Sequence, residues 1–389
     1  MAKSTAAEIQ AAVQNELADT PYAATSLRAL SGGNANFIYH AKLQAPLPDG
    51  RCDVVVKHGE GYVATSPEFA ITVARCKVEE AVLRYMARFP AFPRTFTFHT
   101  RTPTLLYFNP ATSTNVQEYL PEAMSLKHYA LQHFKTATAD SLARPHCYSL
   151  GLSLGMWLRM FHRWVREGDN SALRDLVAAN TEMQAIKKRL NYDNLPQSMA
   201  RHQPDVGDCR DMFKQVADMA AAELRDSESL HVIHGDFWTG NILLPDAPIG
   251  LGRTTQVFVV DWEMAQLGVQ AEDFGQLVAE LWQLKLYAGI DAGIWIIEGF
   301  AEGYGRVDLA FILRAVVHVA AHLIAFGSNT PGWGTPEQNK EVALVGKETM
   351  KKALSNDMQA FRGHPLQTLF RYLGINDIKL VKGQNGVVE

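Results

Sequence analysis

Two polar residues with the spacing of a phosphoryl-transfer loop, Asp236 and Asn241, lie in the segment HGDFWTGN. Transfer of a phosphoryl group from ATP requires an acceptor hydroxyl held in line with the phosphate, and metal ions held on the phosphate oxygens. An aspartate at the head of a short loop can accept the proton of the hydroxyl, and an asparagine further along the loop can turn back to ligate magnesium. The pattern H-x-D-x-x-x-x-N therefore predicts that Asp236 and Asn241 are catalytic residues and that Asn241 is also a metal ligand.

A second metal ligand follows on the next predicted strand. Residues 242–244 and 256–260 have strand character and are joined by a connection rich in proline and glycine, so that the chain returns beside Asn241 at Asp261. Magnesium prefers oxygen ligands and takes few of them from the protein when phosphate and water supply the rest. We therefore predict a Mg2+ site formed by Asn241, Asp261 and Glu263. An aspartate at a strand end is more often a helix cap or a turn former, but the loop and the strand together favour the metal site.

The segments HGDFWTGNILL and VFVVDWE resemble the catalytic loop and the metal-binding strand of the aminoglycoside phosphotransferase, choline kinase and methylthioribose kinase group. They look most similar to its methylthioribose kinase-like members and to fungal 4-hydroxytryptamine kinase. The resemblance implies an α+β, protein-kinase-like fold with a mainly β N-lobe at residues 1–120 and a mainly α C-lobe at residues 121–389. It also implies an enzyme that uses ATP and Mg2+ to phosphorylate a hydroxyl of a small molecule, namely a thiosugar, an aromatic alcohol or an amino alcohol.

A glycine-rich turn, SGGN, lies between two strand-like stretches at residues 27–30 and 37–43. Glycine lets backbone N–H groups approach phosphate oxygens closely. On its own the pattern fits an ordinary hairpin turn better than a nucleotide site. The resemblance, however, aligns this turn with the family's phosphate-covering loop. It implies that ATP is bound by Ser31, Gly32, Gly33 and Asn34.

A lysine and a glutamate are predicted to form the ion pair that holds the ATP phosphates. Lys57 ends the β-branched run DVVVK, and a helix is predicted over residues 67–88. In the kinase pattern such a lysine contacts the phosphates and is held by a glutamate of the following helix. Glu79 lies on the mostly apolar stripe of this helix, whereas Glu80 is spaced to pair with Arg84. Because an unpaired carboxylate on a buried stripe costs several kcal/mol, we predict that Glu79 pairs with Lys57.

The segment before Pro121 corresponds in the family to the hinge between the lobes. The resemblance implies that backbone groups of Gln117, Glu118 and Tyr119 hydrogen-bond the adenine of ATP. Recognition by backbone groups leaves no side-chain pattern in the sequence, so the assignment of these three residues depends on their position alone.

The acceptor pocket is implied by the resemblance to lie among the C-terminal helices, with Trp238, His318, His322 and Trp333 as candidate contacts. His318 and His322 have the spacing of a zinc-binding pair, but the glutamate of the H-E-x-x-H motif is absent. Single histidines on apolar helix faces are usually core residues. The arginines, histidines and aromatic residues of this region disfavour polycationic aminoglycosides as acceptors.

One motif points to a different chemistry. Residues 151–155 read G-x-S-x-G, and Asp261 and His318 follow in the chain order of a serine hydrolase. That motif needs a strand, a sharp turn and a helix to expose the serine. Here the helical apolar period runs through the motif, which predicts a long helix with Ser153 in its middle. The alternatives to a kinase therefore remain an ATP-binding protein of this fold without turnover and, more remotely, a serine hydrolase. Phosphorylation of a protein-bound sugar amine is a further possibility.

The tripeptide Asp273-Phe274-Gly275 spells the metal motif of protein kinases. No apolar strand precedes it, and it opens a run with helical spacing. We therefore interpret Asp273 as a residue at a helix N-terminus, where the helix dipole favours an anion. The resemblance implies that an aspartate at this place steadies the catalytic loop.

Composition narrows the class of partner. The chain has 389 residues, 47% of them hydrophobic, and a net charge of -4, so the basic patch of a nucleic-acid-binding protein is not expected. Its four cysteines show no paired spacing, which predicts free thiols in a reducing compartment. The first residues lack the apolar core of a signal peptide, and no run approaches the length of a membrane span, so we expect a cytoplasmic protein without a membrane partner. Residues 191–208 are expected to be irregular and residues 383–389 disordered. The oligomeric state stays open.

Overall fold

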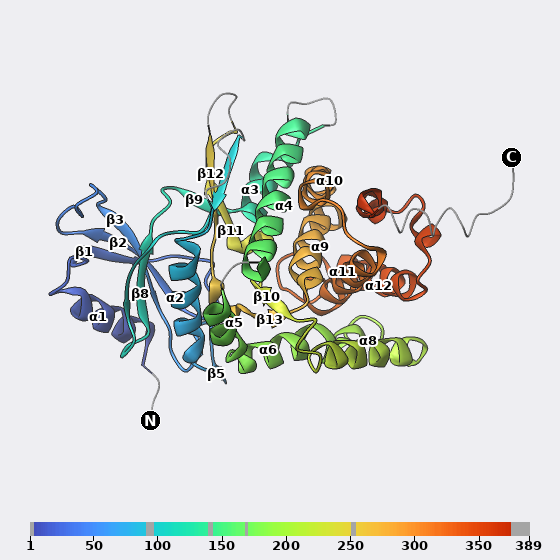
Figure 1. Cartoon of the computed structure of the whole chain (residues 1–389), viewed down its shortest axis with the longest axis horizontal. Helices are drawn as coiled ribbons and strands as arrows, with labels where there is room; N and C mark the ends of the chain where they lie inside the picture. The colour runs from blue at the N-terminus through green and yellow to red at the C-terminus, as the bar shows by residue number, and fades with distance from the viewer. Residues whose placement is uncertain (1–3, 91–96, 139–142, 168–169, 250–253, 375–389) are drawn as a thin grey trace, which may run out of the picture.

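The structure, a computed structural model, describes residues 4–90, 97–138, 143–167, 170–249 and 254–374. The predicted disorder at residues 383–389 lies outside them. Figure 1 shows a sheet-rich region built by the first part of the chain on one side of the molecule and a helix-rich region built by the rest on the other. The predicted α+β fold, mainly β at the N-terminus and mainly α at the C-terminus, is confirmed, while the boundary at residue 120 stays a prediction.

The N-terminal sheet is antiparallel and has the strand order β1-β2-β3-β8-β7. Helix α1 (Ala6–Leu17) begins with a capping box between Thr5 and Glu8, and its buried side chains form a small core with this sheet. The predicted strands around the glycine-rich turn and before Lys57 are confirmed. The strands are β1 (Ala24–Ala29), β2 (Phe37–Leu43), β3 (Asp53–His58), β7 (Leu105–Asn109) and β8 (Thr114–Glu118).

Helix α2 (Ala74–Met86) carries Glu79 and begins later than the predicted helix over residues 67–88. The prediction was wrong for the first residues, because β4 (Tyr62–Val63) and β5 (Ser66–Ala70) form a hairpin there. The Thr65 N–H donates to Asn34 O at 3.1 Å, so this hairpin is held against the glycine-rich turn. A tertiary contact of this kind leaves no mark on helical periodicity.

The helix-rich region carries the larger core, and Figure 1 shows α9 to α12 gathered on the side of the molecule away from β1, β2 and β3. Helix α4 (Ala143–Glu167) is the long helix predicted through the G-x-S-x-G motif. It packs against α10 (Ala292–Tyr304), and α9 (Gln270–Ala288) packs against α10 and α11 (Leu309–His322). This region also contains α3 (Leu126–His133), α5 (Ser171–Ala178), α6 (Thr181–Lys188), α8 (Arg210–Glu223) and α12 (Pro336–Leu354).

Two small sheets position the loops between these helices. One has the order β6-β12-β11-β9, and β11 pairs with β12 in antiparallel register, as predicted for residues 242–244 and 256–260. The other joins β10 to β13. The strands are β6 (Phe98–Arg101), β9 (Ala123–Ser125), β10 (His231–Ile233), β11 (Ile242–Pro245), β12 (Thr255–Val259) and β13 (Gln266–Gly268).

The segment predicted to be irregular, residues 191–208, contains the short helix α7 (Leu195–Ala200), so that prediction was wrong. Pro196 lies in the first turn of α7, where a missing N–H costs nothing. Leu195 and Met199 are fully buried in the large core. Burial therefore supports a helix in a segment that its prolines and polar residues made look irregular.

The G-x-S-x-G motif is a helix-packing feature rather than a hydrolase elbow. A Cβ atom on Gly151 would lie 2.1 Å from Ile296 O, and one on Gly155 would lie 2.1 Å from Phe300 O, so the glycines let α4 approach the α10 backbone closely. Ser153 is fully buried in mid-helix, and its hydroxyl lies 3.0 Å from the hydroxyl of Thr100. A serine hydrolase needs an exposed serine on a sharp turn, so that alternative is excluded.

One helical stretch, Leu309–Gly327, has the length and mean hydropathy, 2.0, of a membrane span, contrary to the expectation that no run is long enough. Within the structure, 72% of its most apolar window is buried. The stretch packs against α9 and α12, as the central helix of a core does. Burial among other helices is therefore enough to account for the apolar composition of this stretch.

Candidate active site

The loop between β10 and β11 carries Asp236 and is held in place by Asp273, in the first turn of α9. The carboxylate of Asp273 accepts the N–H of His234 at 2.7 Å and the N–H of Gly235 at 3.0 Å. Gly235 has φ +79°, and a Cβ there would lie 2.1 Å from Met264 O, so no other residue fits this turn. The interpretation of Asp273 as a helix N-terminal residue is confirmed.

Asp273 is itself oriented by a buried histidine. Nε2 of His162 lies 3.2 Å from Asp273 Oδ2, and Nδ1 of the same ring lies 2.9 Å from the hydroxyl of Tyr304. Burial would raise the pKa of Asp273, but the hydrogen bond with His162 and the nearby positive charge hold it below its usual value. An ionised Asp273 therefore links α4, α9 and α10 to the backbone of the loop.

Each carboxylate oxygen of Asp236 receives one amide hydrogen bond. Nδ2 of Asn241 donates to Asp236 Oδ2 at 3.0 Å, and Nε2 of Gln276 donates to Oδ1 at 2.7 Å. Burial raises the pKa of Asp236, while the charge of Lys187 opposes that rise. Both oxygens keep a free lone pair, so the carboxylate can accept the proton of a hydroxyl placed beside it.

Asn241 is oriented so that its carbonyl oxygen is available. Its Nδ2 donates both to Asp236 Oδ2 and to Asp236 O, each at 3.0 Å. Since the amide nitrogen is used in this way, Oδ1 is the group left for a cation. The Val260 N–H donates to Asn241 O at 3.0 Å, so the β11–β12 pairing brings Asp261 next to Asn241, as predicted.

Lys57 and Glu79 come together as predicted, and Asp261 joins them, a contact that was not predicted. Nζ of Lys57 lies 2.9 Å from Glu79 and also contacts Asp261 Oδ1. Burial alone would lower the pKa of Lys57, but Asp261 and Glu79 outweigh it and raise the pKa. Burial likewise works against the ionised form of Asp261, and Lys57 reverses that effect and lowers its pKa. Asp261 has φ +67°, a conformation that turns the chain sharply after β12.

Glu263 makes contacts that sequence reasoning missed. Its Oε2 accepts hydrogen bonds from Asn36 Nδ2 at 2.5 Å and from Arg75 Nε at 3.1 Å, which leaves Oε1 for a metal. Burial is the main cause that raises the pKa of Glu263 to about 7. Arg75 is fully buried and stands four residues before Glu79, so helical spacing could have placed it on the inner face of α2.

The glycine-rich turn joins β1 to β2, and the hinge segment lies at the end of β8. Ser31, Gly32 and Asn34 are exposed and Gly33 is half-buried, so the turn is open to a ligand. Gln117 and Glu118 lie in β8, paired with β3 and β7. The Glu118 N–H already donates to Thr104 O at 2.9 Å. The Tyr119 ring stacks on His40 with centroids 4.4 Å apart.

His318 and His322 are both buried but belong to different contacts. His318 Nδ1 lies 2.6 Å from the Tyr192 hydroxyl, and burial keeps the pKa of His318 far below its ordinary value. His322 Nε2 lies 2.7 Å from Glu280 Oε1, and the other Glu280 oxygen accepts the hydroxyl of Thr239 at 3.1 Å. His322 is thus joined to the catalytic loop and His318 is not. The described residues contain no group of three or more His, Cys, Asp and Glu side chains placed to hold a metal, so the zinc interpretation gains no support.

Two tryptophans complete the predicted acceptor contacts. Trp238 is half-buried and folds over Gly240, where an added Cβ would lie 2.2 Å from the indole. Trp333 stacks on Tyr287 with centroids 5.4 Å apart, and Nζ of Lys127 lies 3.6 Å from the centre of its ring. Burial lowers the pKa of Lys127. An aromatic pair with a neighbouring ammonium group therefore lies in the region where the acceptor pocket was predicted.

Comparisons with known proteins agree with this geometry. A family model described as the phosphotransferase enzyme family matches residues 45–310. The chain is 26% identical to the phosphotransferase FrzJ of Cladobotryum sp over 329 residues, which cover 82% of this chain and 84% of that protein. It is 21% identical to the 4-hydroxytryptamine kinase of Psilocybe cubensis over 335 residues, which cover 86% of this chain and 89% of that protein. A solved choline/ethanolamine kinase family protein from Mesorhizobium loti shares the fold, with a TM-score of 0.50 and 15% identity over 90% of this chain and 98% of that one.

Proposed function

Since the chain belongs to the phosphotransferase enzyme family and is a small-molecule kinase, we propose that it transfers the γ-phosphoryl group of ATP to a hydroxyl of a thiosugar, an aromatic alcohol or an amino alcohol, with Mg2+ as its cofactor. The observation that carries the catalytic assignment is the environment of Asp236, whose two oxygens are each fixed by one amide donor, from Asn241 and from Gln276. A carboxylate held in this way can orient the hydroxyl and accept its proton while the phosphoryl group moves.

The metal would be held by Asn241 Oδ1 and the carboxylate of Asp261, with Glu263 Oε1 as a further predicted ligand. These are oxygen donors, as Mg2+ requires, and they are few, as expected where phosphate and water complete the coordination shell. Orientation supports the assignment, because the Asn241 amide nitrogen is used by Asp236 and its carbonyl oxygen is not. A bound Mg2+ would supply positive charge on the phosphate oxygens of ATP.

The nucleotide is proposed to bind between the two regions of the chain, with residues 1–120 as the N-lobe and residues 121–389 as the C-lobe. Lys57, held by Glu79, would neutralise the phosphates, and the exposed turn at residues 31–34 would cover them. Because the Glu118 N–H is already used inside the sheet, we propose that Tyr119 supplies the hinge backbone contact nearest to adenine.

The acceptor is proposed to lie beside Glu280 and the Trp333–Tyr287 pair. Glu280 is bonded to Thr239 of the catalytic loop, and its pKa is lowered because His322 and other donors outweigh its burial. An ionised carboxylate favours an ammonium group, and stacked aromatic rings favour a flat apolar one. Both features suit an amino or aromatic alcohol, as does the similarity to 4-hydroxytryptamine kinase.

Free thiols support the proposed cytoplasmic location. Cys52, Cys76, Cys147 and Cys209 are all unpaired, and only Cys52 is exposed. Unpaired cysteines are typical of proteins kept in a reducing compartment. The expected lack of nucleic-acid and membrane partners stays a prediction.

The test is release of ADP from ATP and Mg2+ by the purified protein with hydroxytryptamines, methylthioribose, choline, ketosamines or aminoglycosides as acceptors. One acceptor should stimulate release, and Asp236→Asn should lower kcat by about 10²–10⁴-fold while ATP binding is kept. A variant as active as the wild type would contradict the role of Asp236. A protein that binds ATP and Mg2+ but releases no ADP with any acceptor would favour the alternative of a kinase fold without turnover.

A further inference from the structure

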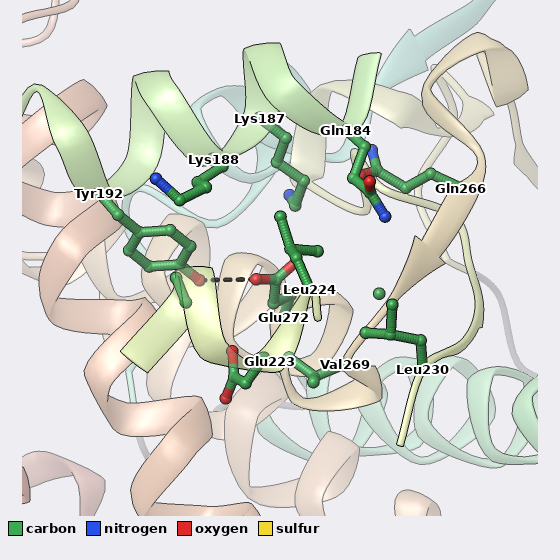
Figure 2. Close-up of a pocket in the computed structure, with 12 residues that line it drawn as sticks. Gln184, Lys187, Lys188, Tyr192, Glu223, Leu224, Leu230, Gln266, Val269 and Glu272 are labelled. Carbon is green, nitrogen blue, oxygen red and sulfur yellow. Dashed lines mark hydrogen bonds between the residues drawn. The ribbon is translucent and has the colours of Figure 1, made fainter. Parts of the chain in front are cut away.

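A buried lysine lies behind the catalytic loop and belongs to none of the roles described so far. Lys187, near the end of α6, is only 4% exposed. Its Nζ donates to Gly235 O at 2.7 Å and to Gln276 Oε1 at 3.0 Å. Figure 2 shows Lys187 and its neighbour Lys188 extending from the same helix, with their amino groups diverging.

The burial of this ammonium group is costly. An ion taken out of water needs a counter-ion or several hydrogen bonds, because desolvation costs several kcal/mol. The two acceptors of Lys187 are a backbone carbonyl and a side-chain amide, and neither carries a charge. Its charge nevertheless acts on two carboxyl groups, because it opposes the rise that burial causes in the pKa of Asp236 and contributes to the lowered pKa of Asp273. A costly group of this kind is expected where function requires it.

Lys187 determines which way the Gln276 amide faces. A lysine ammonium has three donors and no acceptor, so only the oxygen of the amide can face it. The nitrogen of the same amide must then face the other way, toward Asp236 Oδ1, 2.7 Å away. Were the amide reversed, two donors would meet at Lys187 and two acceptors at Asp236. Only one orientation of the Gln276 amide therefore satisfies both hydrogen bonds, the one with Lys187 and the one with Asp236.

We propose that Lys187 is a positioning residue of the kinase reaction, which holds Asp236 in its working orientation through Gln276 and holds the Gly235 peptide at the head of the loop. The inference rests on the proposed function, because it takes Asp236 as the residue that orients the acceptor hydroxyl. In this proposal the buried ammonium group of Lys187 acts through Gly235 and Gln276 and contacts neither ATP nor the acceptor itself. It differs from a cation that merely stabilises the fold, because its loss should affect the chemical step more than substrate binding.

The test compares Lys187→Met with Lys188→Met. Lys188 is the next residue of α6, and its Nζ pairs with Asp193 rather than with the catalytic loop. Both of these side chains are partly exposed, so Lys188 is the matched control. Lys187→Met should lower kcat by about 10–100-fold, with KM for ATP and for the acceptor changed by less than about threefold. Lys188→Met should keep kcat within about twofold. An unchanged kcat in Lys187→Met, or a rise in both KM values with kcat kept, would overturn the proposal.

A second variant tests the route through Gln276 and serves if Lys187→Met fails to fold. Gln276→Met should show the same pattern of lowered kcat and retained KM. In the double variant the two losses should combine to less than their product, because both remove the same orientation of Asp236. Full multiplication of the losses, or a normal kcat in Gln276→Met, would show that the relay does not act.

The two proposals fail in different ways. If the wild-type protein releases no ADP with any acceptor, the proposed function is wrong and the role of Lys187 falls with it. If the wild type is active and Lys187→Met matches it in kcat, only the positioning role is wrong.

Discussion

Nζ of Lys57 lies 2.9 Å from each of the two carboxylate oxygens of Glu79. The side chains are 7% and 2% exposed, so the pair is shielded from water. The N–H of Trp262 also donates to Glu79 Oε1 at 3.3 Å, which ties the pair to the segment that follows Asp261. Breaking a buried pair by removing one partner is costly, because the other charge stays behind.

The first prediction concerns this pair. Lys57→Met should lower kcat/KM for ATP by about 100-fold, since one donor aimed at charged phosphate oxygens is lost. Glu79→Gln should lower it less, because Asp261 still contacts Lys57. Steady-state kinetics with ATP varied would check both. Glu80→Gln, which loses only the partner of Arg84, is the control and should match the wild type. An ordinary kcat/KM in Lys57→Met would contradict the assignment of the phosphate site.

The second prediction concerns magnesium. Asp261→Asn should raise the Mg2+ concentration needed for half-maximal activity, because a neutral amide is a weaker ligand for a hard cation than a carboxylate. The variant should also lose the increase in melting temperature that Mg2+ adds in the presence of ATP. Asp291→Asn, which alters a surface pair with Lys285, should change neither measurement. Equal Mg2+ dependence in wild type and Asp261→Asn would remove Asp261 from the metal site.

The third prediction concerns pH and stability. Burial works against the ionised form of Glu118, but its bonds to Arg101, both at 2.7 Å, and to Thr104 lower its pKa to about 2. A lowered pKa stabilises the folded state above the unfolded pKa, near 4.5, and this stabilisation is lost as pH falls toward 2. Glu118→Gln should therefore cost about 1–3 kcal/mol at pH 7. Urea unfolding at several pH values should show the gap between the two proteins closing below pH 4.5 and constant above it.

The fourth prediction concerns the crossing of α4 and α10. Gly151→Ala should destabilise the protein by about 1–3 kcal/mol or more, because the new Cβ would meet backbone rather than a flexible side chain. Gly61→Ala is the control, since nothing lies within 4 Å of a Cβ at that position. Thermal unfolding measures both. Equal melting temperatures for the two variants would show that the helices separate at little cost.

Local spacing predicted the parts of the site that lie close together in the chain. The loop from Asp236 to Asn241 and the position of Glu79 on its helix follow from short periodic patterns, and the two-lobed fold follows from the resemblance that those segments carry. The G-x-S-x-G motif was interpreted correctly as helix, because its apolar period is helical throughout.

Other residues of the site could not be predicted, because their partners are remote in sequence. Asn36 and Glu263 are 227 residues apart, and Lys187 and Gln276 are 89 apart. Asn, Glu, Lys and Gln are usually exposed, and here only tertiary packing buries them. The start of α2 was misplaced for the same reason, since the β4–β5 hairpin depends on a contact with the glycine-rich turn.

Gly151 and Gly155 let α4 lie close to the backbone of α10, and this close packing is linked to the active site. Tyr304, on α10, contacts His162, on α4, and His162 contacts the Asp273 carboxylate that carries the loop amides. The crossing of α4 and α10 is therefore connected through hydrogen bonds to the backbone of the catalytic loop. A Cβ at Gly151 is expected to push α10 away from α4, and with it Tyr304 away from His162. We therefore expect turnover to respond to the size of the residues at this crossing, which the proposed substrates do not contact.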